Sequence, residues 1–120
     1  MRVAITGGPK TGKTTLAGPD AKHTDDLIAA KGWSEISSLA ALWFNQPDPN
    51  LCVEGVAVPR ALRKWLQTYP TGKPVDELVI LTRTHENLTR EQENMGKGHD
   101  TVLREISKEL KTRGVRIREV

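Results

Sequence analysis

Short apolar runs alternate along the chain with segments in which apolar residues recur every three or four positions. The runs predict five strands, near residues 2–6, 21–25, 51–55, 77–82 and 115–120. The third and fourth contain uninterrupted apolar stretches, as expected for central parallel strands that are covered on both faces. The last strand alternates apolar and charged residues, which predicts an edge strand with one solvated face.

Three segments between the strands have the spacing of amphipathic helices. Their apolar stripes are Ile36, Leu39, Ala40 and Trp43; Leu62, Trp65, Leu66 and Tyr69; and Leu103, Ile106 and Leu110. Pro59 suits the first turn of the second helix, and Gly114 ends the third. Strands separated by helices predict one α/β domain over residues 1–120, an open and mostly parallel five-stranded sheet with helices on both faces.

The segment after the first strand fills the pattern G-x-x-x-x-G-K-[ST]. In this pattern glycines let backbone N–H groups approach phosphate oxygens, the lysine reaches the β- and γ-phosphates, and the last hydroxyl ligates Mg²⁺. The nucleotide-binding residues it predicts are Gly7, Gly8, Pro9, Lys10, Thr11, Gly12, Lys13, Thr14 and Thr15. We therefore expect a bound nucleoside triphosphate, ATP or another, with Mg²⁺ at Thr14. A glycine-rich turn without a ligand is the alternative.

Polar residues stand at or just past the strand ends, where ligands of parallel α/β sheets bind: Thr6, Asp25, Glu54 and Thr82. Asp25 is expected to orient an acceptor hydroxyl or act as its base, with turn capping as the alternative. Glu54 is the expected metal-side acid, acting on Mg²⁺ or its water shell, and a solvated strand end is the alternative. Arg60, in the first turn of the next helix, is expected to hold a phosphate in bidentate fashion.

The polar stretch 83–99 is too long for a plain turn. Residues 89–92 match a capping box, which predicts a short helix ending near Gly96. The cations of the stretch are Arg83, Arg90 and Lys97. With Gly96 and Gly98 as hinges, the segment could close over phosphates as a lid; a disordered surface loop is the alternative.

Composition narrows the partners only slightly. Lys and Arg number 18 against 15 Asp and Glu, a net charge of +3 that suits anionic ligands but does not favour nucleic acid. Cys52 is the only cysteine, so no intramolecular disulfide forms. His85 and His99 are too far apart in sequence to indicate a local metal site. No stretch approaches the roughly 18 apolar residues needed to cross a bilayer, and we expect a cytoplasmic protein without membrane contact. The sequence does not indicate the oligomeric state.

Taken together, the chain resembles small kinase-type phosphate-loop proteins. It is similar to nucleoside and nucleotide kinases, and to compact kinases or ATPases predicted in bacteriophage genomes. The resemblance runs through residues 7–14, 23–27, 53–56, 59–66 and 95–98. It implies Mg²⁺-dependent phosphoryl transfer from ATP to a small acceptor such as a nucleoside or nucleotide. Lys13, Asp25 and Arg60 would be catalytic, and Thr14 and Glu54 would serve the metal.

The helix after the phosphate-binding pattern departs from that group. Gly18 and Pro19 end it within about two turns, earlier than is usual there. This favours one alternative to a kinase, a non-catalytic nucleotide-binding or regulatory module. A simple NTPase is the other alternative.

Overall fold

The computed structural model describes residues 1–7, 21–24, 32–81 and 89–120. Within these residues, five strands form one sheet in the order β2-β3-β1-β4-β5, and every neighbouring pair is parallel. The strands are β1 (Val3–Gly7), β2 (Lys22–His23), β3 (Cys52–Glu54), β4 (Glu77–Leu81) and β5 (Arg116–Glu119). The five predicted strands are confirmed, and β5 lies at an edge of the sheet as its alternating pattern predicted.

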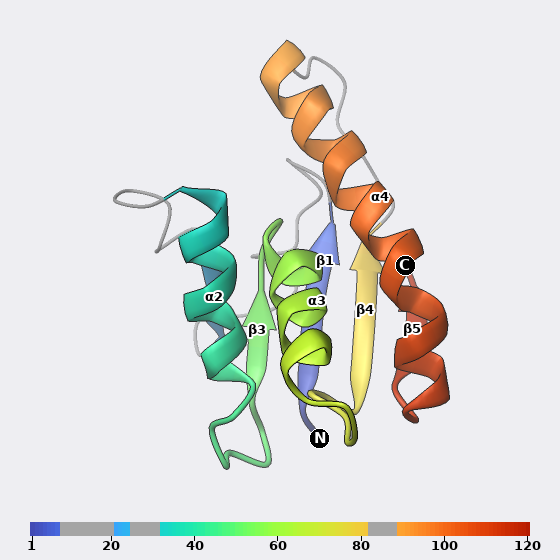
Figure 1. Cartoon of the computed structure of the whole chain (residues 1–120). Helices are drawn as coiled ribbons and strands as arrows, with labels where there is room; N and C mark the ends of the chain where they lie inside the picture. Colours follow the sequence, from blue (N-terminus) through green and yellow to red (C-terminus); the bar gives the residue numbers. More distant parts are fainter. Residues whose placement is uncertain (8–20, 25–31, 82–88) are drawn as a thin grey trace.

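The three helices of the described residues lie side by side on one face of this sheet (Figure 1). They are α2 (Trp33–Trp43), α3 (Val58–Thr68) and α4 (Arg90–Thr112). Pro59 lies in the first turn of α3, as expected. Helices on both faces stay a prediction, because residues 8–20, which connect β1 to β2, lie outside the described part of the chain.

α4 is one continuous helix of 23 residues, about 35 Å long at 1.5 Å per residue. The prediction of a short helix ending near Gly96 is therefore wrong, and Gly96 and Gly98 are helical rather than hinges between elements. The first turns of α4 project beyond the sheet (Figure 1), and none of their described residues belongs to an apolar core cluster. Residues 89–99 of the expected lid thus belong to α4 or precede it directly, and 82–88 lie outside the described residues.

The main apolar core fills the space between the sheet and the three helices. Alternation along the strands places Ala4, Leu78 and Ile80 in this core, whereas Ile5 and Val79 belong to a smaller cluster on the opposite face. The helices contribute further buried side chains, among them Leu62, Trp65, Leu103, Ile106 and Leu110. The same alternation determines to which face of the sheet each polar side chain at the strand ends points.

β1 is the central strand of the sheet, with β3 on one side and β4 on the other. The chain passes from β1 to β2, returns through β3, and then crosses β1 to reach β4 and β5. The carboxyl end of β1 is therefore the point where the strand order reverses, and ligands of open α/β sheets bind at such a point. The phosphate-binding pattern begins there, at Gly7.

Candidate functional site

The carboxyl edge of the sheet brings together three of the predicted site residues. Gly7 ends β1 and Glu54 ends β3, and Glu54 lies in register with Ile5 of the neighbouring strand. Arg60 lies in the first turn of α3, which starts from the same edge. The other predicted residues, Gly8 to Thr15 and Asp25, lie outside the described residues, so their placement stays a prediction.

Glu54 is fully buried and forms a side-chain pair with His23. Its Oε1 atom hydrogen-bonds to Nδ1 of His23, which stands directly opposite it on β2. Because β3 alternates and Cys52 packs with the smaller cluster, Glu54 faces away from the three helices. A buried carboxylate needs such a partner to offset its lost hydration. His23 is a strand residue, as expected, and it also orients the acid.

Thr6 lies on the other face of the same edge and is linked to α4. Its hydroxyl donates to the carbonyl oxygen of Gly55 at 2.9 Å, and Nε2 of His99 lies 2.7 Å from the same hydroxyl. Thr6 is 0% exposed and His99 is 1% exposed. Nδ1 of His99 lies 3.0 Å from a carboxylate oxygen of Asp100. Three segments that are distant in sequence thus meet in one buried hydrogen-bonded group.

Sequence reasoning missed His99, although a signal for it was present. The residue continues the apolar stripe of α4 at the helical spacing of Leu103 and Ile106. A polar residue on a core-facing stripe needs a buried partner. The stripe therefore indicated that His99 would be bonded inside the protein, but not that Thr6 would be the partner.

Gly55 allows the ends of β2 and β3 to approach closely. Its φ angle is +143°, and a Cβ atom there would lie 1.7 Å from Oγ1 of Thr24. Any other residue would therefore have to displace the Thr24 side chain, besides adopting a backbone conformation that only glycine tolerates well. The Thr24 hydroxyl is buried and has no hydrogen-bond partner among the described residues. The backbone at Gly55 therefore packs directly against the side chain of Thr24.

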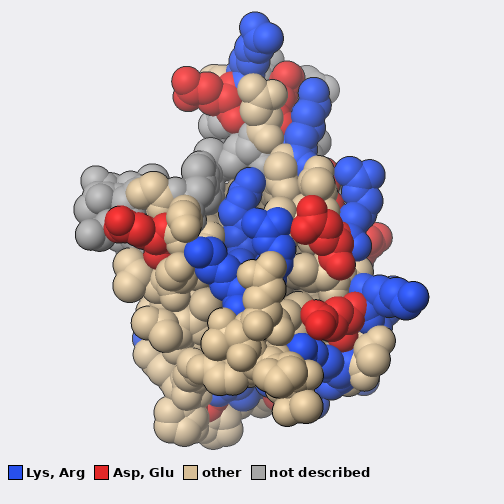
Figure 2. All heavy atoms as spheres, viewed as in Figure 1, with Lys and Arg blue, Asp and Glu red and all other residues tan. Residues whose placement is uncertain are grey.

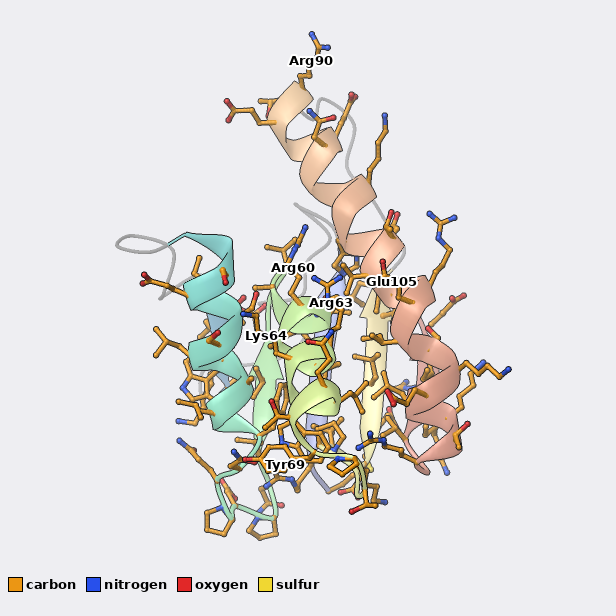
Figure 3. All side chains as sticks on the ribbon, in the orientation of Figure 1. Arg60, Arg63, Lys64, Tyr69, Arg90 and Glu105 are labelled. Atoms are coloured by element: carbon orange, nitrogen blue, oxygen red, sulfur yellow. The ribbon has the colours of Figure 1, made fainter. Side chains whose placement is uncertain are left out.

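Arg60 belongs to a cluster of cations at the start of α3. Figure 3 shows Arg60, Arg63 and Lys64 on this helix, and Figure 2 shows blue side chains gathered over it. Burial lowers the pKa of Arg60, and the neighbouring charge of Arg63 lowers it further. Both effects disfavour the cation, so an anion bound nearby would stabilise it.

The two other cations of this cluster have different partners. Arg63 pairs with Glu105 at 3.1 Å, whereas Nζ of Lys64 donates to the neutral hydroxyls of Ser34 and Ser38 at 3.2 and 2.9 Å. Arg90, expected in the lid, lies at the far tip of α4, well away from Arg60 (Figure 3). Among the described residues, the cationic cluster near the start of α3 therefore consists of side chains of that helix.

Among the described residues, no group of three or more His, Cys, Asp or Glu side chains could hold a metal ion. Of the two predicted metal-side residues, Glu54 is in the described part and Thr14 is outside it. No helix in that part is long and apolar enough to cross a membrane. Comparisons with protein-family models, with curated proteins and with solved structures found no match for the chain. The case for function therefore depends on the residues and their arrangement.

Proposed function

We propose that the protein binds Mg²⁺-ATP at the carboxyl edge of its sheet and transfers the γ-phosphoryl group to a small acceptor such as a nucleoside or nucleotide. One observation carries this proposal. The central strand β1 leads directly into a complete phosphate-binding pattern at Gly7, and the adjacent strand β3 ends beside it in a buried acid, Glu54. The lysine that binds phosphate would then follow β1, and the acid that acts on the metal would end the neighbouring strand β3.

The residues at this edge suit Mg²⁺, because carboxylate and hydroxyl oxygens are hard ligands. Thr14 and Glu54 would hold the ion, either directly or through its water shell. When bound, the metal would neutralise charge on the β- and γ-phosphates. His23 already holds one oxygen of Glu54 and would keep the carboxylate in a fixed orientation.

The remaining chemistry is positioning and charge neutralisation by side chains. Lys13 would reach the β- and γ-phosphates, and Asp25 would orient the acceptor hydroxyl and take its proton. Arg60, a partly buried cation beside Arg63, would hold a phosphate of either substrate.

The first test separates nucleotide binding from the alternative of a turn without a ligand. Mg²⁺-ATP should raise the melting temperature of the wild type, because a ligand that binds only the folded state stabilises it by mass action. Lys13→Ala should lose most of this shift. The control is Lys108→Ala, an exposed lysine on α4, which should shift like the wild type. Equal shifts in all three proteins would refute the assignment of the phosphate-binding pattern.

A second candidate function is a nucleotide-binding module without transfer, or a simple NTPase. The observation that favours it is the complete burial of Glu54 under His23, an arrangement that also suits a purely structural acid. ADP formation should be measured with a panel of nucleosides, nucleotides and small alcohols. Acceptor-dependent ADP supports the kinase; acceptor-independent ADP supports an NTPase; binding without ADP supports the module.

Asp25→Asn refines the same assay. The substitution should lower acceptor-dependent turnover far more than it lowers the affinity for Mg²⁺-ATP, because the proposed role of Asp25 concerns the acceptor. A loss of ATP affinity with unchanged turnover would assign Asp25 to the nucleotide instead.

A further inference from the structure

α4 meets the carboxyl edge of the sheet through two consecutive residues, Gly98 and His99. A Cβ atom at Gly98 would lie 2.8 Å from Nη2 of Arg60, and Nε2 of His99 lies 2.7 Å from the hydroxyl of Thr6. We infer that this pair of residues positions both the phosphate-binding arginine and the end of β1 from which the phosphate-binding pattern departs. The inference rests on the proposed function and adds positioning residues from a helix that the pattern does not include.

Two hydrogen bonds hold the Thr6 hydroxyl in place. It donates to the carbonyl oxygen of Gly55, and it forms a second hydrogen bond with Nε2 of His99. Both side chains are almost completely buried, where the loss of one partner leaves the other without hydration. α4 thereby holds β1 one residue before Gly7, at the point where a small shift would pass into the phosphate-binding segment.

Because Gly98 has no side chain, the guanidinium of Arg60 can lie close to the backbone of α4. Glycine in a helix interior costs about 1 kcal/mol relative to alanine, so its presence in α4 needs a reason. The Nη2 atom of Arg60 lies 2.8 Å from the position of such a Cβ atom, closer than side chains normally approach. Because the contacting atom is the end of a long side chain, a methyl group there would move the guanidinium rather than unfold the helix. Gly98 therefore sets where the charge of Arg60 lies.

α4 is continuous from Arg90 to Thr112, so its projecting first turns and its packed second half belong to one element. A helix attached to both Arg60 and Thr6 couples its own position to phosphate binding, and such coupling is reciprocal. The rigid part of the proposed site thus extends from α3 and β1 to α4.

The first experiment compares Gly98→Ala with Thr101→Ala, an exposed position on the same helix. Both substitutions favour the helix, so both proteins should melt at or above the wild-type temperature. Only Gly98→Ala should shift the Nε–H NMR signal of Arg60 in the nucleotide-free protein, and only it should lower acceptor-dependent kcat, by about tenfold. The double variant Gly98→Ala/Arg60→Ala should be no slower than Arg60→Ala. An unmoved Arg60 signal with wild-type kcat would overturn the role of Gly98.

The second experiment uses four single variants of the hydrogen-bonded residues and one double variant. His99→Leu and Thr6→Val should each weaken Mg²⁺-ATP binding about tenfold by calorimetry, and the double variant should bind no more weakly than either one, because both remove the same interaction. Thr6→Ser and His99→Gln, which keep the hydroxyl and an amide donor, should bind within about threefold of wild type. A merely structural His99 would lower the melting temperature in His99→Leu and leave the affinity of the folded protein unchanged, which would overturn its positioning role.

The two proposals fail in different ways. If the wild type shows no Lys13-dependent binding of Mg²⁺-ATP, the proposed function falls and the inference falls with it. If the wild type binds and depends on Lys13, but the Gly98, His99 and Thr6 variants match it, only the inference falls.

Discussion

At the amino edge of the sheet, one long side chain joins several surface loops, whereas at the carboxyl edge short side chains from distant segments meet in the interior. The Arg2 guanidinium donates to the carbonyl oxygens of Phe44, Gln46, Asp48 and Pro74, and the Arg2 amide donates to Asp76 at 2.8 Å. The carboxyl edge instead buries Thr6, Glu54 and His99 almost completely, each with a side-chain partner.

In the proposed function, the amino edge serves stability and the carboxyl edge serves a ligand. Arg2 satisfies carbonyl groups that loops leave at the surface, and its charge makes these hydrogen bonds stronger than neutral ones. Buried networks of short polar side chains cost more hydration, but they hold their members in one geometry. Such a network is useful where the geometry must be fixed. In the proposed function, that place is the end of β1. The predictions below test this division.

The largest expected effect on stability is at the amino edge. Arg2→Ala should lower the free energy of unfolding by about 2–3 kcal/mol, because several carbonyl groups lose a charged donor at once. The folded variant should bind Mg²⁺-ATP like the wild type. Denaturant unfolding and calorimetry measure the two quantities, and Arg116→Ala, a mostly exposed arginine on β5, is the control. A changed nucleotide affinity with unchanged stability would reverse the division between the edges.

Two buried acids allow a matched comparison of the edges. Glu54 ends β3 at the carboxyl edge, and Glu77 begins β4 at the amino edge, where Nε of Arg118 donates to it at 3.0 Å. Glu54→Gln should weaken Mg²⁺-dependent ATP binding about tenfold, as loss of a residue that orients or binds the metal does. Glu77→Gln should affect stability alone. Magnesium titrations at fixed ATP measure the effect, and equal responses of the two variants would remove Glu54 from the metal site.

A smaller effect is expected for Asp76 in acid. The hydrogen bond from the Arg2 amide lowers the pKa of Asp76, and Lys73 lowers it further. A carboxyl group whose pKa is lower in the folded state stabilises the protein above its unfolded pKa of about 3.9, and this contribution is lost as the pH falls through the folded value. Asp76→Asn should therefore be less stable than wild type near neutrality, and the two should converge in strong acid.

Urea unfolding between about pH 7 and pH 2 checks this expectation. The control is Glu119→Gln, an exposed acid on β5, which should follow the wild type throughout. A constant difference between Asp76→Asn and wild type at every pH would mean that the charge of Asp76 does not contribute.

The smallest effect concerns Cys52. Burial raises the pKa of this thiol, and the negative charge of Glu54 raises it further. Because the thiolate is the nucleophile, alkylation at about pH 8 should be slower than that of a small free thiol. Glu54→Gln should speed the reaction modestly, and Glu77→Gln should not. A rate equal to that of a free thiol would show that neither burial nor the charge of Glu54 protects Cys52.

Much of the fold follows from local patterns. The strands 52–54 and 77–81 were readable because a parallel strand covered on both faces needs consecutive apolar residues, and 116–119 because an edge strand alternates. α3 was readable because its apolar spacing and Pro59 agree. Local chemistry also placed Glu54 and Arg60 at the carboxyl edge, since the chain direction of a parallel sheet decides where each strand ends.

The continuity of α4 was not readable in the same way. Its first turns are polar and contain two glycines, so propensity and pattern both indicated an interruption. Tertiary packing of the second half, through Leu103, Ile106 and Leu110, stabilises a helix that extends past its own core contacts. Helix propensity and apolar spacing within 90–99 could not predict this stabilisation, because it comes from contacts with other elements.

By itself, then, the sequence determined the order of strands and helices, the presence of the pattern from Gly7 to Thr14, and an acid and an arginine at the carboxyl edge of the sheet. Only the tertiary structure decided that His99 bonds to Thr6, which is 93 residues away, and that Gly98 leaves room for Arg60. The physical reason is that periodicity and turn chemistry act between neighbours in the chain. Hydrogen bonds and close contacts between elements depend on the sheet order, which brings together residues whose spacing in the sequence carries no signal.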